Sequence, residues 1–384
     1  MGNHDFDVRS LPEICGLDQD RINLAKKRQV AVWKREKPDK WPVIAVGKLS
    51  QEQEKIPNPN LKEAFYDSDL MLCSQMRGAC AAANSNSDIV PSIRANMGTG
   101  TIVSCLGLEQ EIFEDKMPWL GQHLTKEQVS KLTPDDIKIR GTFELGLRHM
   151  RRFKEIMGDI VGVYCMDTQG PFDLAHLVMG DEIFYQFYDD PPFVHHLMDI
   201  CLDLGIKTHT WMKEVSGEPK DKEYHGGLYA ENMGIRICED TTAIVGEEII
   251  REFAMPYTQR LAKHFGGAWV HYCGRNDHLT QAICEIPEVR AINFGIMPGG
   301  KQSHNWKEEM DRMAKYKKVF FGAWPKDDNE SDRDFLRRMH ESAVKGLIVP
   351  EIGYALFDCI KARDNRGGDP IGSLDEALDF WYSL

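Results

Sequence analysis

Short apolar, β-rich runs that alternate with longer helical stretches constrain the fold of this chain most strongly. There are eight such runs, at residues 43–46, 89–95, 160–166, 234–238, 268–272, 289–294, 319–323 and 347–350. Continuous apolar strands separated by helices are typical of a parallel sheet that is covered on both faces. Eight strand–helix units predict an α/β chain that closes into a (β/α)8 TIM barrel.

The first part of the chain fits this repeat less well. Residues 21–37 are basic and have a helical pattern, and residues 62–77 predict another helix. We therefore expect residues 1–85 to form an N-terminal helical extension that includes the first barrel strand. Residues 86–384 form the remainder of a single barrel in this interpretation. A further insertion is expected at residues 212–224, where glycine, proline and charges cluster.

Composition excludes several classes of protein. Sixty acidic against 47 basic residues give a net charge of −13, which argues against nucleic-acid binding. No run of 18 apolar residues predicts a membrane span, and the first residues lack the pattern of a secretory signal. The ten cysteines are scattered without a Cys-x-x-Cys motif, so we expect reduced thiols and a cytoplasmic protein.

Polar residues gather where the predicted strands end, which is where barrels of this kind build their sites. Each by itself could simply cap the next helix, but their position on one rim favours a shared site. The rim comprises Arg94, Asn96, Thr99, Asp167, Gln169, Glu239, Asp240, His271, Cys273, Asn293, Trp324 and Glu351. We expect catalytic roles for Asp167, Glu239 and Asp240, and substrate binding by Asn96, Gln169, Asn293 and Trp324.

The sharpest motif is His271-Tyr272-Cys273-Gly274, at the end of an apolar run. Residues at i and i+2 can converge on one ion where a strand bends into its loop. An imidazole together with a thiolate suits zinc, and Gly274 allows a tight turn. By itself His-x-Cys is a weak motif that more often fills a core.

A catalytic zinc usually takes three protein ligands, and the third ligand here is open. We prefer Glu239, with Glu351 as a further candidate. Cys359 is a better donor but lies eight residues beyond Glu351. In a regular strand the side chain of Cys238 points away from that of Glu239.

Several stretches of the chain together resemble the uroporphyrinogen decarboxylase superfamily, and within it the zinc-dependent, cobamide-linked methyltransferases. The resemblance spans about residues 89–350 and rests on the order of residues 167–175, 235–241, 253–257 and 271–274. It implies a TIM barrel, a zinc ion and a cobamide carried by a partner corrinoid protein.

Two departures qualify this resemblance. Decarboxylases of the family hold substrate carboxylates with an arginine pair near the first strand, whereas residues 43–48 contain none. The methyltransferases usually carry a cysteine at the end of the last strand, where this chain has Pro350-Glu351-Ile352. The first departure disfavours decarboxylation of a porphyrinogen, and the second disfavours a His/Cys/Cys zinc site.

The resemblance implies methyl transfer between a small donor, for which we prefer an aryl methyl ether, and a corrinoid protein. Two alternatives remain. One is a metal-free lyase in which His271 is a general acid, and the other is a non-catalytic protein that binds a corrinoid protein or a tetrapyrrole. The expected partners are a corrinoid protein and a small methyl donor, without nucleic acid or membrane, and we also consider a homodimer.

Overall fold

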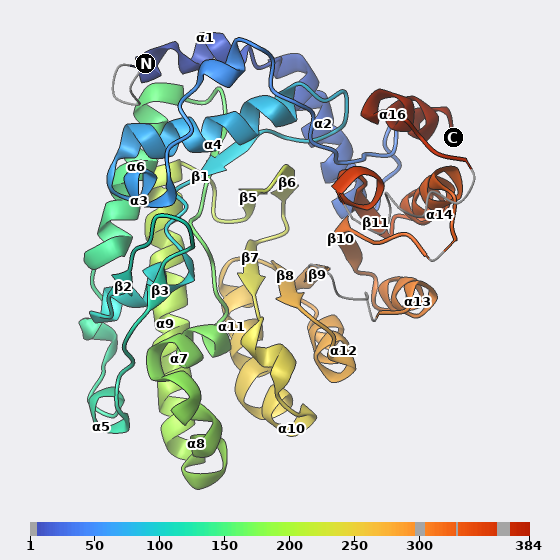
Figure 1. The fold of residues 1–384 in the computed structure, drawn as a ribbon. Helices are drawn as coiled ribbons and strands as arrows, with labels where there is room; N and C mark the ends of the chain where they lie inside the picture. The colour runs from blue at the N-terminus through green and yellow to red at the C-terminus, as the bar shows by residue number, and fades with distance from the viewer. Residues whose placement is uncertain (1–5, 296–303, 328, 359–368) are drawn as a thin grey trace.

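The computed structural model describes residues 6–295, 304–327, 329–358 and 369–384. Figure 1 shows a central parallel sheet flanked by helices, with the N-terminal helices crossing one end of the molecule. The helices are α1 Leu11–Cys15, α2 Gln19–Trp33, α3 Leu61–Tyr66, α4 Ser68–Ala83, α5 Lys126–Val129, α6 Gly141–Met157, α7 Pro171–Met179, α8 Ile183–Asp189, α9 Pro191–Ser216, α10 Glu247–Ile249, α11 Met255–His264, α12 Asp277–Glu285, α13 Trp306–Tyr316, α14 Asp332–Val344 and α16 Leu374–Ser383.

The strands confirm an α/β chain with a parallel sheet. Strands β7 Ile235–Cys238, β8 Ala268–Cys273, β9 Val289–Gly295, β10 Val319–Ala323 and β11 Ile348–Glu351 form one parallel sheet in sequence order. Strands β1 Ser92–Arg94 and β4 Gly162–Tyr164 form a second parallel pair. Two short antiparallel pairs complete the set, β2 Gln110–Glu111 with β3 Trp119–Leu120, and β5 Lys222–His225 with β6 Leu228–Glu231.

The ladders do not close into the predicted eight-stranded barrel within the described residues. Single parallel bridges join Ile44 to Glu351 and Gln169 to Cys238, so the segments follow one another in the order that a barrel requires. Between β4 and β7, however, stands the hairpin β5–β6, which neighbours both strands. A Cβ atom added to Gly162 of β4 would lie 2.6 Å from the Tyr224 ring, so the hairpin occupies the place where β4 and β7 would pair.

Alternation along the strands separates two faces of the sheet. Ile235, Ile237 and Val270 face the helices and join the main hydrophobic core. Their neighbours Arg236, Cys238 and His271 therefore lie on the opposite, inner face. This alternation decides which polar groups can meet one another.

The amino end of the inner face is filled by apolar side chains. Trp33 of α2 packs edge-on against Trp269 of β8 and Phe321 of β10, with ring centroids 6.1 and 6.4 Å apart. Buried Gln29 holds α2 in place by donating to the carbonyls of Asp88 and Gly227. The N-terminal helices thus seal this end of the sheet.

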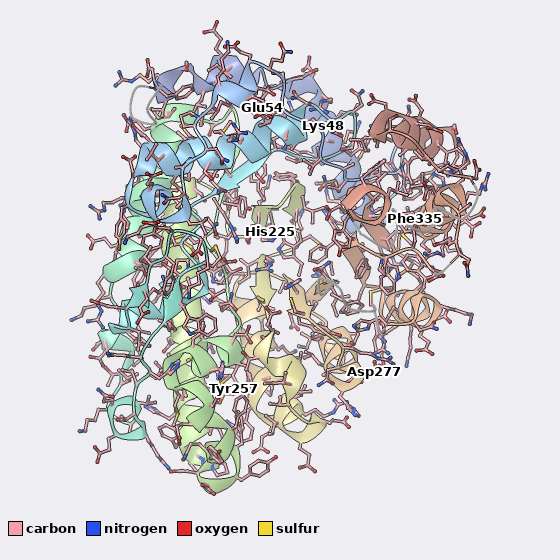
Figure 2. The ribbon with its side chains drawn as sticks, viewed as in Figure 1. Lys48, Glu54, His225, Tyr257, Asp277 and Phe335 are labelled. Atoms are coloured by element: carbon pink, nitrogen blue, oxygen red, sulfur yellow. A yellow bond between two sulfur atoms is a disulfide. The ribbon has the colours of Figure 1, made fainter. Side chains whose placement is uncertain are left out.

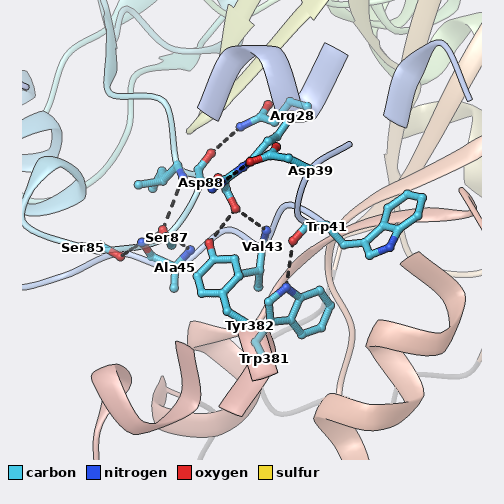
Figure 3. Close-up of polar contacts among 12 residues, drawn as sticks. Arg28, Asp39, Trp41, Val43, Ala45, Ser85, Ser87, Asp88, Trp381 and Tyr382 are labelled. Atoms are coloured by element: carbon cyan, nitrogen blue, oxygen red, sulfur yellow. Dashed lines mark hydrogen bonds and ion pairs between the residues drawn. The ribbon is translucent and has the colours of Figure 1, made fainter. Parts of the chain in front are cut away.

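A buried polar cluster attaches the C-terminal helix to the first predicted strand (Figure 3). The Asp88 carboxylate pairs with Arg28 at 2.8 Å and accepts from the Tyr382 hydroxyl at 2.6 Å. The Trp381 indole donates to the carbonyl of Trp41. The C-terminal helix α16 therefore packs against the segment that follows α2 and against Asp88.

The structure also bears on the helix expected at residues 62–77, on the state of the thiols and on the expected absence of a membrane span. The helix expected at residues 62–77 forms as α3 and α4, which meet at Asp67, the N-cap of α4. Cys15 and Cys80 form a disulfide, which corrects the expectation that all thiols are reduced. Among the described residues no helix combines the length and apolar character needed to cross a membrane.

Candidate metal centre

The carboxyl ends of β7 and β8 bring three metal-binding side chains together. Cys238 and His271 are paired across the two strands, and Asp240 lies two residues after the end of β7. The Cys238 thiol, an Asp240 carboxylate oxygen and a His271 ring nitrogen all lie within 4.8 Å of one another. Because Cys238 pairs with His271, the end of β7 lies beside the polar residues near the end of β8.

A hydrogen bond that His271 donates to Asn293 fixes the orientation of the imidazole. The two residues are paired across β8 and β9, and the Asn293 side-chain oxygen contacts His271 Nδ1. The amide nitrogen of Asn293 donates to the carbonyl of Phe321. His271 therefore carries its proton on Nδ1 and offers the lone pair of Nε2. Asn293, which is expected to bind substrate, thus uses one end of its amide to orient the histidine and the other to bond β10.

Cys273 lies close to His271 Nε2, the ring nitrogen that does not contact Asn293. Its Sγ is 3.4 Å from His271 Nε2, and its backbone N–H donates to Asp240 at 2.6 Å. Asp240 Oδ1 in turn lies 3.7 Å from His271 Nε2. A Cβ atom at Gly295 would come within 2.5 Å of Cys273 Sγ, so a glycine there leaves room for the thiol. Gly274 has φ +94°, the tight turn expected of it.

Burial favours the neutral forms of Cys273 and His271 in this group. It raises the pKa of the Cys273 thiol to about 11 and lowers the pKa of His271. Two thiols, an imidazole and a carboxylate are the donors that zinc favours in proteins, and a cation among them would stabilise both thiolates. The residues present therefore fit the metal that the resemblance implies.

Glu239, the preferred third ligand, lies outside this group. Its carboxylate is fully buried and accepts hydrogen bonds from the Thr242 and Thr258 hydroxyls. Burial raises the pKa of Glu239 to about 7. Because Cys238 faces inward, the next residue along the strand faces the helices. The structure thus brings Cys238 to the centre in place of Glu239, and it leaves Glu239 no contact with an inner-face ligand.

The other ligand candidates are also separated from the centre. Glu351 ends β11, beyond β9 and β10 from His271, and is paired with Ala323 and Ile44. It belongs to neither group of metal-binding side chains found among the described residues. Cys359 lies outside the described residues. The second such group, Asp277, His304 and Glu309, lies beside Gly274, whose carbonyl contacts His304 Nε2 at 3.0 Å.

Asp167 and Gln169 lie near the centre, on the chain that follows β4. Asp167 forms an ion pair with Arg94 at 2.6 Å. Gln169 is buried and bridges to Cys238. Figure 2 shows His225 in the middle of the molecule, and its ring lies 5.4 Å from Tyr164 and 6.0 Å from Trp269. Sequence reasoning missed His225 because the hairpin that carries it was not predicted.

The remaining substrate-binding candidates lie elsewhere. Trp324 is 2% exposed and packs in the core against Phe320 and Trp306, so its ring is structural. Asn96 lines a separate pocket with Phe65, Met117 and other residues of α3, α4 and the β2–β3 region. Residues 296–300 of the glycine-rich loop that follows β9, including Met297, lie outside the described residues.

Comparisons with known proteins agree with this architecture. Residues 24–212 match the family model described as uroporphyrinogen decarboxylase (URO-D). A solved structure of a methyltransferase from Methanosarcina mazei superposes with a TM-score of 0.62 at 15% identity, covering 94% of this chain and 97% of that one. A search of curated proteins finds no match. The structural likeness concerns the fold, whereas the family match identifies residues 24–212 as a uroporphyrinogen decarboxylase (URO-D) family domain.

Proposed function

We propose that this protein is an enzyme that transfers a methyl group between a small methyl donor and a corrinoid protein, with zinc bound at the carboxyl ends of β7 and β8. The convergence of Cys238, Asp240 and His271, with Cys273 beside the same ring nitrogen, carries the proposal. The URO-D family domain and the likeness to a methyltransferase support it. The family's closed TIM barrel and a cobamide on the partner protein belong to the same proposal.

In this proposal Cys238, His271 and Cys273 hold the zinc, and Asp240 either completes the set or takes a proton. A bound zinc would polarise the heteroatom that carries the methyl group. Asp240 is suited to proton transfer because its side chain is half-exposed and within 3.7 Å of His271. Asp167 can orient a substrate through its pair with Arg94. Asn293 keeps the imidazole in the tautomer that binds metal.

A metal-free lyase would use the same residues differently. His271 would then act as a general acid, for which it must be protonated on both ring nitrogens. Burial, together with the neighbouring Arg236, lowers the pKa of His271 and disfavours that charged form. The pair of thiols beside the ring would also be left without a role, so the zinc-binding interpretation accounts for more of the site.

The direct test is a methyl-donor screen with zinc-loaded protein and a reduced corrinoid protein. Aryl methyl ethers are the first donors, and the appearance of methylated corrinoid is followed by its absorption spectrum. We expect transfer with at least one donor and none with a Cys273→Ala variant. Turnover that persists after complete removal of zinc would rule out the proposed centre.

A further inference from the structure

Arg236 is a buried cation without a partner on the inner face of the sheet. Arg236 is only 8% exposed, and its Nε atom makes no hydrogen bond. Within the part of the chain that the structure describes, no carboxylate forms an ion pair with its guanidinium. Its backbone N–H donates to Glu223, so this carboxylate binds the main chain of Arg236 and not its side chain.

The other charged groups nearby are already paired. Arg94, the second arginine on the inner face, contacts Asp167 at 2.6 Å. Glu223 lies 3.7 Å from Lys213, which also neighbours Glu218. Asp240 is shared between His271 and the backbone of Cys273. Among the described residues the Arg236 guanidinium therefore has no direct ion-pair partner, although Glu223 is close enough for the two charges to interact.

The position of Arg236 relates it to the metal centre. It shares β7 with Cys238, two residues further along, and alternation places both side chains on the inner face. In the register of the sheet it lies opposite Trp269, two residue pairs before Cys238 and His271. Burial raises the pKa of both thiols and lowers that of His271, and Arg236 is close enough to oppose the rise in the thiols and to add to the fall in His271. A molecule bound at the thiols would thus have the Arg236 guanidinium on the same inner face of the sheet, two residues nearer the amino end of β7.

A buried guanidinium without a counter-ion is costly, and such groups in proteins are normally paired. A planar fork of N–H donors matches a carboxylate in shape and charge. We propose that Arg236 binds the anionic group of the substrate, so that the substrate is a small organic anion, with a carboxylate as the expected group. This inference rests on the proposed function for its methyl donor, which becomes a methoxylated aromatic or aliphatic acid.

Binding without turnover tests the inference independently of methyl transfer. We would titrate the zinc-loaded protein by calorimetry with 4-methoxybenzoate and with its neutral isostere 4-methoxybenzamide, and extend the pair to a panel of methoxylated acids and amides. Hydrogen bonds to a charged group predict that the acid binds about 10-fold to 100-fold more tightly than the amide. Inorganic phosphate serves as a third probe, and displacement of the acid by phosphate supports a general anion site.

Two variants separate a binding role from a structural one. Arg236→Gln should remove the preference for the acid, whereas Arg236→Lys should retain part of it. Loss of an unpaired buried charge predicts a melting temperature for Arg236→Gln that is unchanged or higher. Equal affinity for acid and amide across the panel would overturn the inference, as would a preference that survives in Arg236→Gln. Acid binding without any methyl transfer would refute the proposed function and leave the anion site standing.

Discussion

The two ends of the inner face of the sheet differ in chemistry although the same strands form both: the amino end is apolar and the carboxyl end is polar. At the amino end, Trp269 and Phe321 pack with Trp33 in an apolar cluster that the N-terminal helices cover. Two residues further along β8, His271 begins a polar region that contains both thiols and Asp240. Because successive inward residues of one strand lie close together, a rigid apolar cluster directly supports the reactive groups.

Residues at the amino end of these strands therefore contribute mainly to stability, and residues at the carboxyl end mainly to metal binding. Removal of a side chain at the amino end should cost folding free energy but leave the metal ligands in place. Removal of a ligand at the carboxyl end should cost metal binding and little stability. The following predictions test that division.

The largest effect is expected for His271→Ala, which removes the only nitrogen ligand of the proposed centre. We predict at least a 100-fold loss of zinc affinity and of methyl transfer, since even indirect partners of a ligand contribute 10-fold to 100-fold. Competition with a chelator measures the affinity. His278→Ala is the matched control, because His278 is exposed on α12 and pairs with Glu247. Equal zinc affinity in His271→Ala and the control would contradict the site.

Phe321→Ala should instead destabilise the apolar cluster at the amino end of the sheet. The ring is 4% exposed, and its centroid lies 5.3 Å from that of Trp269. A cavity left by a buried phenylalanine costs about 3–5 kcal/mol of folding free energy. We expect denaturant unfolding to show this loss, with zinc content per folded chain unchanged. A loss of zinc at unchanged stability would mean that the two ends are not separate.

Asn293→Ala should weaken the centre without removing a ligand. Without its oxygen the Nδ1 tautomer of His271 is no longer enforced, and zinc affinity should fall by about 10-fold to 100-fold. Asn293→Asp keeps an acceptor for the Nδ1 proton and should retain most of the affinity. If alanine and aspartate variants behave alike, the hydrogen bond does not orient the ring.

The last prediction concerns the pH dependence of stability through Glu218, which is buried beside Lys213. Burial raises the pKa of Glu218 from 4.5 to about 8, so the folded chain holds this proton more tightly than the unfolded chain. Between these pH values stability should fall as pH rises, by at most about 1.4 kcal/mol per unit. Glu218→Gln should flatten this slope in melting temperatures measured from pH 5 to 8. A parallel slope in wild type and variant would assign the effect to another group.

The sequence predicted the parallel strands β7 to β11 and the pair His271 and Cys273, because apolar runs and their ends are local signals, whereas the run at residues 43–46 forms only a bridge at Ile44. It was not sufficient to place Cys238. The alternation Ile235-Arg236-Ile237-Cys238 separates two faces, but only the packing of both isoleucines against helices shows which face is inner. The same pattern contains Arg236, which received no role from the sequence.

The hairpin β5–β6 shows a signal that was present and overlooked. Gly226 and Gly227 both have positive φ, 53° and 91°, as a two-residue hairpin turn requires. Alternating residues on both sides, from Lys222 to Glu231, complete the pattern. The separation of β4 from β7 could not be predicted in this way, because it depends on the Tyr224 ring fitting against Gly162.

The central claim is that thiols from two adjacent strands share one metal with His271. Substitution of zinc by cobalt(II) tests it most directly, because thiolate ligands give charge-transfer absorption in the near ultraviolet. We expect one cobalt per chain and an intense thiolate band in the wild type. Because each thiolate contributes about half of it, the band should fall by about half in Cys238→Ser and by about half in Cys273→Ser. A band unchanged in Cys238→Ser, or no thiolate band in the wild type, would contradict this claim.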